Sequence, residues 1–160
     1  MAHLLIHRGL AKKDFIENTI SAFRYCFKKK YGIETDIHCT KDRKIVCFHD
    51  FNLKGKFKIN KYVKNIKYKD LLKISKYKKK PIPLLNDLIK LSNNKRFLMI
   101  DIKPLLTEEN LKILIKEIKN LKNYSLTSFK EQNIINLYKI QKNLNLGLII
   151  PSTLTFDKVI

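Results

Sequence analysis

Residues 33–50 read IETDIHCTKDRKIVCFHD, two short apolar runs that each carry polar side chains. The first run, IETDI, alternates by two, so Glu34 and Asp36 point to the same face of a strand. The second run, IVCFH, ends at His49. Two acids on one strand face, next to a strand that ends in a histidine, indicate that these strands carry chemistry as well as core.

Apolar runs of this kind alternate with helical patterns along the rest of the chain. Strand-like runs cover residues 3–7, 33–37, 45–49, 97–103, 124–129 and 146–150. Helical spacing predicts helices at about residues 18–30, 70–77, 85–91, from the capping Thr107 to about Leu121, and 130–143. This alternation predicts an α/β fold with a mainly parallel sheet or barrel, in which polar side chains gather at the carboxyl ends of the strands.

The connection between the strand-like runs 33–37 and 45–49 is unusually short. Only eight residues separate Asp36 from Ile45, whereas a parallel crossover needs a dozen or more. A hairpin whose register faces Asp36 with His49 would fit, and a stretched crossover without a helix is the alternative. Either connection brings the acids and His49 to one mouth of the sheet.

Length and composition predict one globular domain over residues 1–160, because 44% of the chain is hydrophobic. No run is apolar enough to span a bilayer, and the first strand-like run begins at His3, which leaves no space for a leader. We therefore expect a cytoplasmic protein. Its three cysteines lack CxxC spacing and are expected to be reduced residues of the core.

The chain has a net charge of +20, and only four of its 34 basic residues are arginine. Such a surface attracts nucleic acid, anionic lipid or phosphorylated substrates. The lysines are scattered throughout, which is typical of a general compositional bias. Nucleic-acid readers favour arginine and stacking aromatics, so nucleic-acid binding is not expected.

The acidic side chains form a candidate metal site. Glu34 and Asp36 share a strand face, and Asp101 lies in another strand-like run, FLMIDIK. Carboxylate oxygens are the ligands that Mg²⁺ and Ca²⁺ prefer, and burying two anions without a cation is costly. The alternative is an exposed strand face with salt bridges to nearby lysines.

Histidines and cations accompany these acids. His7 and His49 each follow an apolar run and fit general acid–base catalysis, in which one removes a proton and the other supplies one. Arg8 and Lys103 could contact phosphate oxygens, and the alternative for both is a solvated charge. We assign no role to His38, although it shares the face of the acids.

The sequence lacks the motifs of several other enzyme classes. It contains no Walker loop, no GxGxxG and no GxSxG elbow, and four glycines in all make a nucleotide cradle improbable. No Cys-His-Asn arrangement is evident around any cysteine.

Five segments, in order and at similar spacing, carry a resemblance to a known family: HRGLAKKDFIENTISAF, GIETDIHCTKDRKIVCFHD, IPLLNDLIKL, LMIDIKP and LTSF. From His3 to about Ile150 the chain resembles the glycerophosphodiester phosphodiesterase family. The resemblance implies an irregular (βα)8 barrel of the TIM type and hydrolysis of glycerophosphodiesters to glycerol 3-phosphate and an alcohol. It also implies one divalent cation, Mg²⁺ or Ca²⁺.

The resemblance further implies a role for each matching motif position. Two histidines look like the acid–base pair, three acids like the metal ligands, two cations like phosphate contacts, and one more acid like a supporting residue near the substrate. In that order these are His7 and His49; Glu34, Asp36 and Asp101; Arg8 and Lys103; and Glu17.

The chain departs from the family pattern at single positions and in length. Ile16 stands where a proline is common, Arg43 where glycine is common, and Asp101 where the family usually has glutamate. The loss of one methylene at Asp101 puts direct contact with the metal in question. A (βα)8 barrel needs about 250 residues, so we expect an incomplete barrel of about six strands, either a fragment or one closed by a partner such as a second copy.

Two other functions remain open at this point. One is a lysophospholipase D-like activity at an anionic membrane, for which Phe51 and Phe57 are the candidate lipid contacts. The other is an inactive or truncated domain that only binds.

Overall fold

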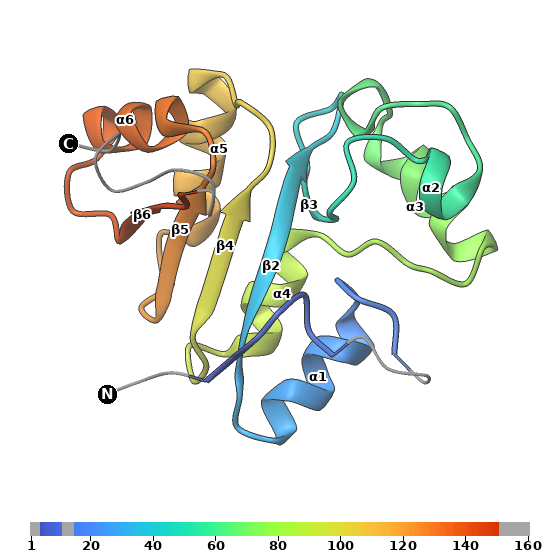
Figure 1. Cartoon of the computed structure of the whole chain (residues 1–160), viewed down its shortest axis with the longest axis horizontal. Coiled ribbons are helices and arrows are strands. Elements are labelled where there is room, and N and C mark those ends of the chain that lie inside the picture. The colour runs from blue at the N-terminus through green and yellow to red at the C-terminus, as the bar shows by residue number, and fades with distance from the viewer. Residues whose placement is uncertain (1–3, 11–14, 151–160) are drawn as a thin grey trace.

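The computed structural model describes residues 4–10 and 15–150 and shows an α/β fold built on one sheet (Figure 1). The strands are β1 (Leu5–Ile6), β2 (Gly32–Cys39), β3 (Ile45–Cys47), β4 (Leu98–Ile102), β5 (Tyr124–Ser128) and β6 (Leu146–Leu148). The helices are α1 (Ile20–Lys28), α2 (Lys54–Phe57), the 3₁₀ helix η1 (Val63–Asn65), α3 (Tyr68–Tyr77), α4 (Leu85–Ser92), α5 (Glu108–Ile118) and α6 (Glu131–Ile140).

The sheet has six strands, as predicted, and its main path is parallel. The order is β1-β2-β4-β5-β6, and β3 pairs only with β2, in antiparallel orientation. In the described part of the chain, five strands therefore form the wall of a barrel that has eight when complete. The predicted fold class, an incomplete α/β barrel, is confirmed.

The short connection after β2 is a hairpin, but its register differs from the one considered above. Ile37 lies opposite Cys47, and the amide of Phe48 donates to the carbonyl of Asp36 at 2.9 Å, so Asp36 faces Phe48 and not His49. The turn sets this register: the amide of Arg43 donates to the carbonyl of Thr40, and Arg43 has a φ of 59°. A left-handed backbone at this position explains why a glycine would fit there.

Two apolar clusters hold the fold together. The larger one lies between the sheet and helices α1, α4, α5 and α6, and it includes the three cysteines, which are free and buried as expected. The second lies beneath the lysine-rich segment that follows β3 and includes Phe48, Leu53, Phe57 and Val63. This cluster anchors the segment that carries His49.

None of the helices among the described residues is long and apolar enough to cross a membrane.

Candidate active site

Three carboxylates meet on neighbouring strands, two from the middle of β2 and one from near the carboxyl end of β4. Alternation along β2 puts Glu34 and Asp36 on one face, and the parallel register of the two strands puts Asp36 directly beside Asp101. One oxygen from each side chain lies within 4.8 Å of the others. Oxygen ligands lie about 2.1–2.6 Å from Mg²⁺ or Ca²⁺, so three oxygens this close can share one ion.

The electrostatics of this cluster favour a cation. Burial, reinforced by the charge of Asp36, raises the pKa of Glu34 to about 7. Burial also raises the pKa of Asp101, an effect that Lys103 partly offsets. Oδ1 of Asp101 is buried and, among the described residues, has no hydrogen-bond partner. A buried carboxylate oxygen without a donor fits a metal ligand, and the shorter side chain of Asp101 still reaches the cluster.

Two cations neutralise part of this negative charge. Nζ of Lys103 lies 3.2 Å from Oδ1 of Asp36 and 3.1 Å from Oδ2 of Asp101, and Nε of Arg8 lies 3.0 Å from Oδ2 of Asp36. Burial opposes the charge of Lys103, but Asp101 and Asp36 outweigh it and raise the lysine's pKa. Lys103 is therefore charged, and both basic side chains lie directly against the acids.

The loop after β1 places Arg8 by a sharp change of direction. Arg8 and Gly9 both have a left-handed backbone, with φ of 54° and 68°. A Cβ at Gly9 would lie 3.0 Å from the ring of Phe23, so this turn requires glycine. As a result the amide of Arg8 donates to Oε2 of Glu34 at 3.0 Å.

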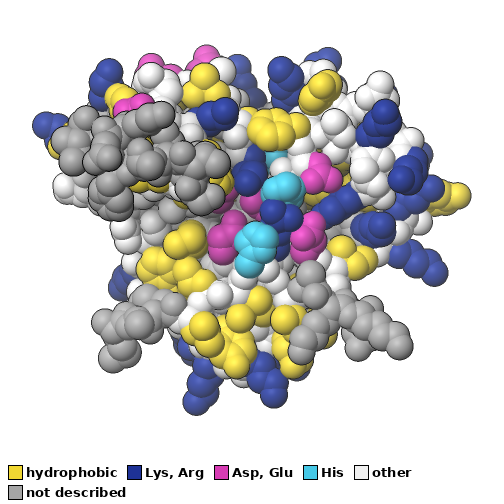
Figure 2. Space-filling view, viewed as in Figure 1, with side chains coloured by type: hydrophobic (Ala, Val, Ile, Leu, Met, Phe, Trp, Pro, Cys, Tyr) yellow, Lys and Arg dark blue, Asp and Glu magenta, His cyan; other side chains and the backbone are white. Residues whose placement is uncertain are grey.

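Both predicted histidines lie at the acidic cluster, where Figure 2 shows histidine, acidic and basic side chains gathered on one face. Nε2 of His7 is 3.9 Å from Oε2 of Glu34, and this side chain is 72% exposed. Nδ1 of His49 is 2.8 Å from Oδ1 of Asp50. His38, for which no partner was predicted, is buried, and its Nε2 hydrogen-bonds the carbonyl of His49 at 3.0 Å. Burial lowers the pKa of His38, which favours a neutral structural role.

Glu17 also lies at the site, and it leads to a residue that the sequence reasoning missed. Oε2 of Glu17 accepts from Nη1 of Arg8 at 3.3 Å, and its other oxygen contacts Nζ of Lys56. Burial raises the pKa of Glu17, but Lys56 and then Arg8 outweigh it and lower the pKa overall. Lys56 is one of many lysines in its segment, so no sequence signal distinguishes it.

Asn18 is a second residue that the sequence reasoning missed. It is buried, its Nδ2 donates to Oδ2 of Asp36 at 3.1 Å, and its Oδ1 accepts from the hydroxyl of Thr35 at 2.8 Å. Its backbone amide donates to the carbonyl of Arg8 at 2.8 Å. Asn18 therefore ties the loop that carries Arg8 to the acids of β2. The only sequence signal for a role of Asn18 is its position in the ENT motif, residues 17–19.

The structure thus brings all eight predicted site residues to one end of the sheet. Fold and site together define a TIM-type barrel protein with a cluster of three acids that could hold a cation, flanked by imidazoles and basic side chains.

Comparison with known proteins identifies the family. Residues 7–148 match the glycerophosphoryl diester phosphodiesterase family, and the chain belongs to it. It is 29% identical over 160 residues to a glycerophosphodiester phosphodiesterase of Caldanaerobacter subterraneus, covering 91% of this chain and 65% of that protein. It is also 39% identical over 66 residues to the human lysophospholipase D GDPD1, covering 41% of this chain and 21% of that protein.

Solved structures show the same fold. The glycerophosphodiester phosphodiesterase of Thermotoga maritima superposes with a TM-score of 0.80 at 22% identity, covering 96% of this chain and 64% of that one. An Oleispira antarctica phosphodiesterase, solved in complex with the product sn-glycerol-3-phosphate, gives a TM-score of 0.79 at 20% identity, covering 95% of this chain and 68% of that one. This chain therefore spans about two thirds of the length of these proteins.

Proposed function

We propose that this protein hydrolyses glycerophosphodiesters to glycerol 3-phosphate and an alcohol, with the help of one divalent cation, Mg²⁺ or Ca²⁺. The observation that carries the proposal is the convergence of Glu34, Asp36 and Asp101, together with the buried oxygen of Asp101 that has no hydrogen-bond partner among the described residues. Family membership and the product bound to the Oleispira relative support the substrate class.

The three acids would hold the cation: Oδ1 of Asp101 is without a partner among the described residues, whereas Asp36 would share its oxygens with Lys103 and Arg8. A bound divalent cation withdraws charge from a non-bridging phosphate oxygen. Arg8 and Lys103 already lie against the same acids, so they can stabilise the negative charge that grows on the phosphate in the transition state. Glu17 and Lys56 keep the guanidinium of Arg8 in place.

The two histidines would move the protons. One takes the proton of the attacking hydroxyl, from water or from the glycerol of the substrate, and the other protonates the departing alkoxide. The contact of Asp50 with Nδ1 of His49 favours the tautomer with the proton on Nδ1 and leaves Nε2 to exchange protons with the substrate. His7, which has the more exposed side chain, can reach a ligand from the solvent side.

The direct test is a glycerophosphocholine hydrolysis assay with Mg²⁺ or Ca²⁺, repeated with chelator and with His49→Ala. We expect turnover that chelator abolishes and that falls by at least a hundredfold in His49→Ala, because an acid–base group contributes about 10²–10⁴-fold. Calorimetric binding of the cation is the matched control, since His49→Ala leaves the three acids intact. Turnover that survives chelator, or a folded His49→Ala variant with full activity, would contradict the proposal.

A lysophospholipase D-like activity is the second candidate, and one observation favours it. Phe51 is 49% exposed and its ring lies edge-on to His38, at 5.1 Å between ring centroids, so it could contact a lipid beside the site. The prediction for Phe57 is wrong, because this side chain is buried in the second apolar cluster. Hydrolysis of lysophosphatidylcholine that is lost in Phe51→Ser, while glycerophosphocholine is still cleaved, would support this activity.

A further inference from the structure

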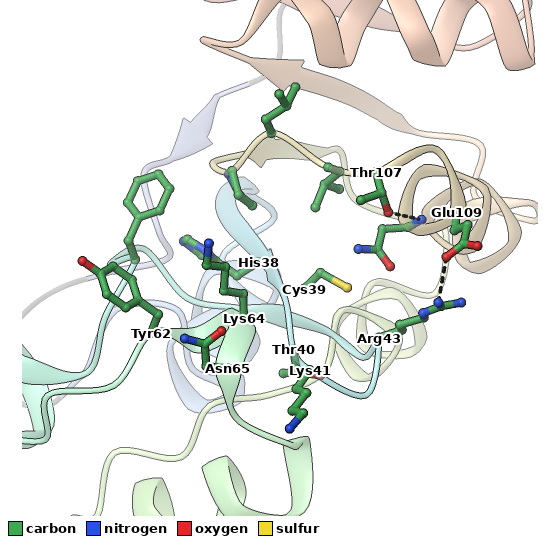
Figure 3. Close-up of a pocket in the computed structure, with 15 residues that line it drawn as sticks. His38, Cys39, Thr40, Lys41, Arg43, Tyr62, Lys64, Asn65, Thr107 and Glu109 are labelled. Atoms are coloured by element: carbon green, nitrogen blue, oxygen red, sulfur yellow. Dashed lines mark hydrogen bonds and ion pairs between the residues drawn. The ribbon is translucent and has the colours of Figure 1, made fainter.

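A cleft of about 930 Å³ lies beside the proposed active site (Figure 3). The end of β2 and its hairpin turn form one wall, the segment around Tyr62 and Lys64 a second, and the start of α5 a third. The hydrolytic mechanism proposed above assigns no role to this cleft, although Phe51, the lipid contact of the second candidate activity, is among its lining residues.

The cleft begins where the active site ends. His38 lines it and follows Asp36 by two residues on the same face of β2, which at about 3.3 Å per residue puts the two about 7 Å apart. Pro104, on the opposite wall, directly follows Lys103. A diester whose phosphate contacts Asp36 and Lys103 through the cation and the ammonium group would therefore have one of its two alcohols at the mouth of this cleft.

The size of the cleft exceeds what a small alcohol needs. Ligand pockets of about 300–1,000 Å³ hold molecules of drug size. Choline or ethanolamine would fill only a small part of 930 Å³. The volume therefore favours an alcohol with a ring or a long polar chain.

The charge of the lining favours an anionic ligand. Lys41 and Lys64 line the cleft and are exposed, and neither has an ion-pair partner among the described residues. Arg43 is paired with Glu109 at 2.7 Å, so these two cancel. Lys64 and His38, both labelled in Figure 3, line the same cleft. The described lining thus has an excess of positive charge and no free carboxylate to receive a quaternary ammonium group.

We propose that this cleft holds the alcohol part of the diester and selects an alcohol that bears further anionic groups, such as a phosphorylated polyol, over a cationic alcohol such as choline. This inference rests on the proposed function, because it takes the phosphodiester to lie at the three acids. Lys64 is the specificity-determining residue, and the half-exposed Tyr62 offers a flat surface for the polyol ring.

The test is calorimetric binding of two ligands that share the glycerophosphate part, glycerophosphoinositol 4-phosphate and glycerophosphocholine, to the full chain carrying His49→Ala so that neither is consumed. We expect the anionic ligand to bind at least tenfold more tightly. Lys64→Glu should weaken its binding at least tenfold and change that of glycerophosphocholine less than twofold. Lys73→Glu, an equal charge reversal at an exposed position of α3 outside the cleft, controls for the general charge of the protein.

Equal affinity for the two ligands, binding of neither, or equal effects of the two charge reversals would overturn the inference. Hydrolysis by the unmodified protein, measured in parallel, distinguishes a failure of the cleft assignment from a failure of the proposed function. Turnover without selectivity refutes only the cleft assignment, whereas selective binding without turnover refutes only the enzymatic activity.

Discussion

Replacing Glu34 by glutamine should make the metal-free protein more stable at pH 8 and at the same time remove its response to a divalent cation. Burial and the neighbouring Asp36 raise the pKa of Glu34 from 4.5 to about 7. The unfolded chain therefore loses this proton more readily than the folded one, and stability falls as the pH rises from about 4.5 to about 7. At about 1.4 kcal/mol per pH unit, the ionised side chain costs the folded protein up to about 3 kcal/mol above pH 7.

Glutamine keeps an oxygen to accept from the amide of Arg8 but carries no charge. In buffer with chelator at pH 8 we expect Glu34→Gln to melt up to about 6–12 °C above the parent protein, since 1 kcal/mol shifts the melting temperature of a domain of this size by about 2–4 °C. At pH 5, about half a pH unit above the ordinary pKa, the cost is only about 0.8 kcal/mol, so the difference should shrink to about a quarter of its value at pH 8. Thermal denaturation followed by circular dichroism measures both.

Adding Ca²⁺ should reverse this order. At a thousand times its dissociation constant, a ligand that binds only the folded state stabilises it by about 4.1 kcal/mol, which exceeds the cost of about 3 kcal/mol, and the variant has lost one of the three acids that would bind the ion. Glu131→Gln, at an exposed position of α6, is the matched control and should track the parent protein throughout. A variant that melts below the parent in chelator at pH 8, or that gains equally from Ca²⁺, would refute the reasoning.

Three further predictions follow from buried polar groups. Asn18→Ala should lower the free energy of unfolding, measured by urea denaturation, by about 2–3 kcal/mol, because it removes two buried hydrogen bonds and places alanine at a φ of 55°. Asn18→Gly should recover only the part of this loss that is due to the backbone, about 1 kcal/mol. Burial raises the pKa of Glu117 to about 7, so Glu117→Gln should raise the melting temperature at pH 8 and raise it much less at pH 5. All three cysteines are buried, and burial raises the pKa of each thiol, to about 12 at Cys47. A disulfide reagent at pH 8 should therefore react with these thiols only after unfolding, and rapid reaction of the native protein would contradict their buried position.

The parts of the site that depend on strand periodicity could be predicted from the sequence. Alternation by two puts Glu34 and Asp36 on one face, and the expectation of parallel strands brings Asp101 beside them. Thr107 caps α5 as its position predicted, accepting from the amide of Asn110. These features follow from local pattern and a simple topology, which a single sequence displays.

The parts of the fold and site that depend on turn conformation or on pairing between distant residues could not be predicted from the sequence. The hairpin register shifts by one residue because the turn closes with Arg43 in a left-handed conformation, a choice that an arginine does not signal. Helix α2 lies in a segment whose many lysines conceal the spacing of Leu53 and Phe57. Lys56 pairs with Glu17 across 39 residues, which no local pattern encodes.

The antiparallel hairpin of β2 and β3 has a consequence for the order in which the centre assembles during folding. His49 is only 11 positions after His38, so their contact closes a short loop and costs little chain entropy. The pairing of Asp36 with Asp101 must wait for some sixty more residues and a full crossover. We therefore expect His49, Glu34 and Asp36 to be in place early in folding. The chain can hold a cation only later, when β4 docks and adds Asp101.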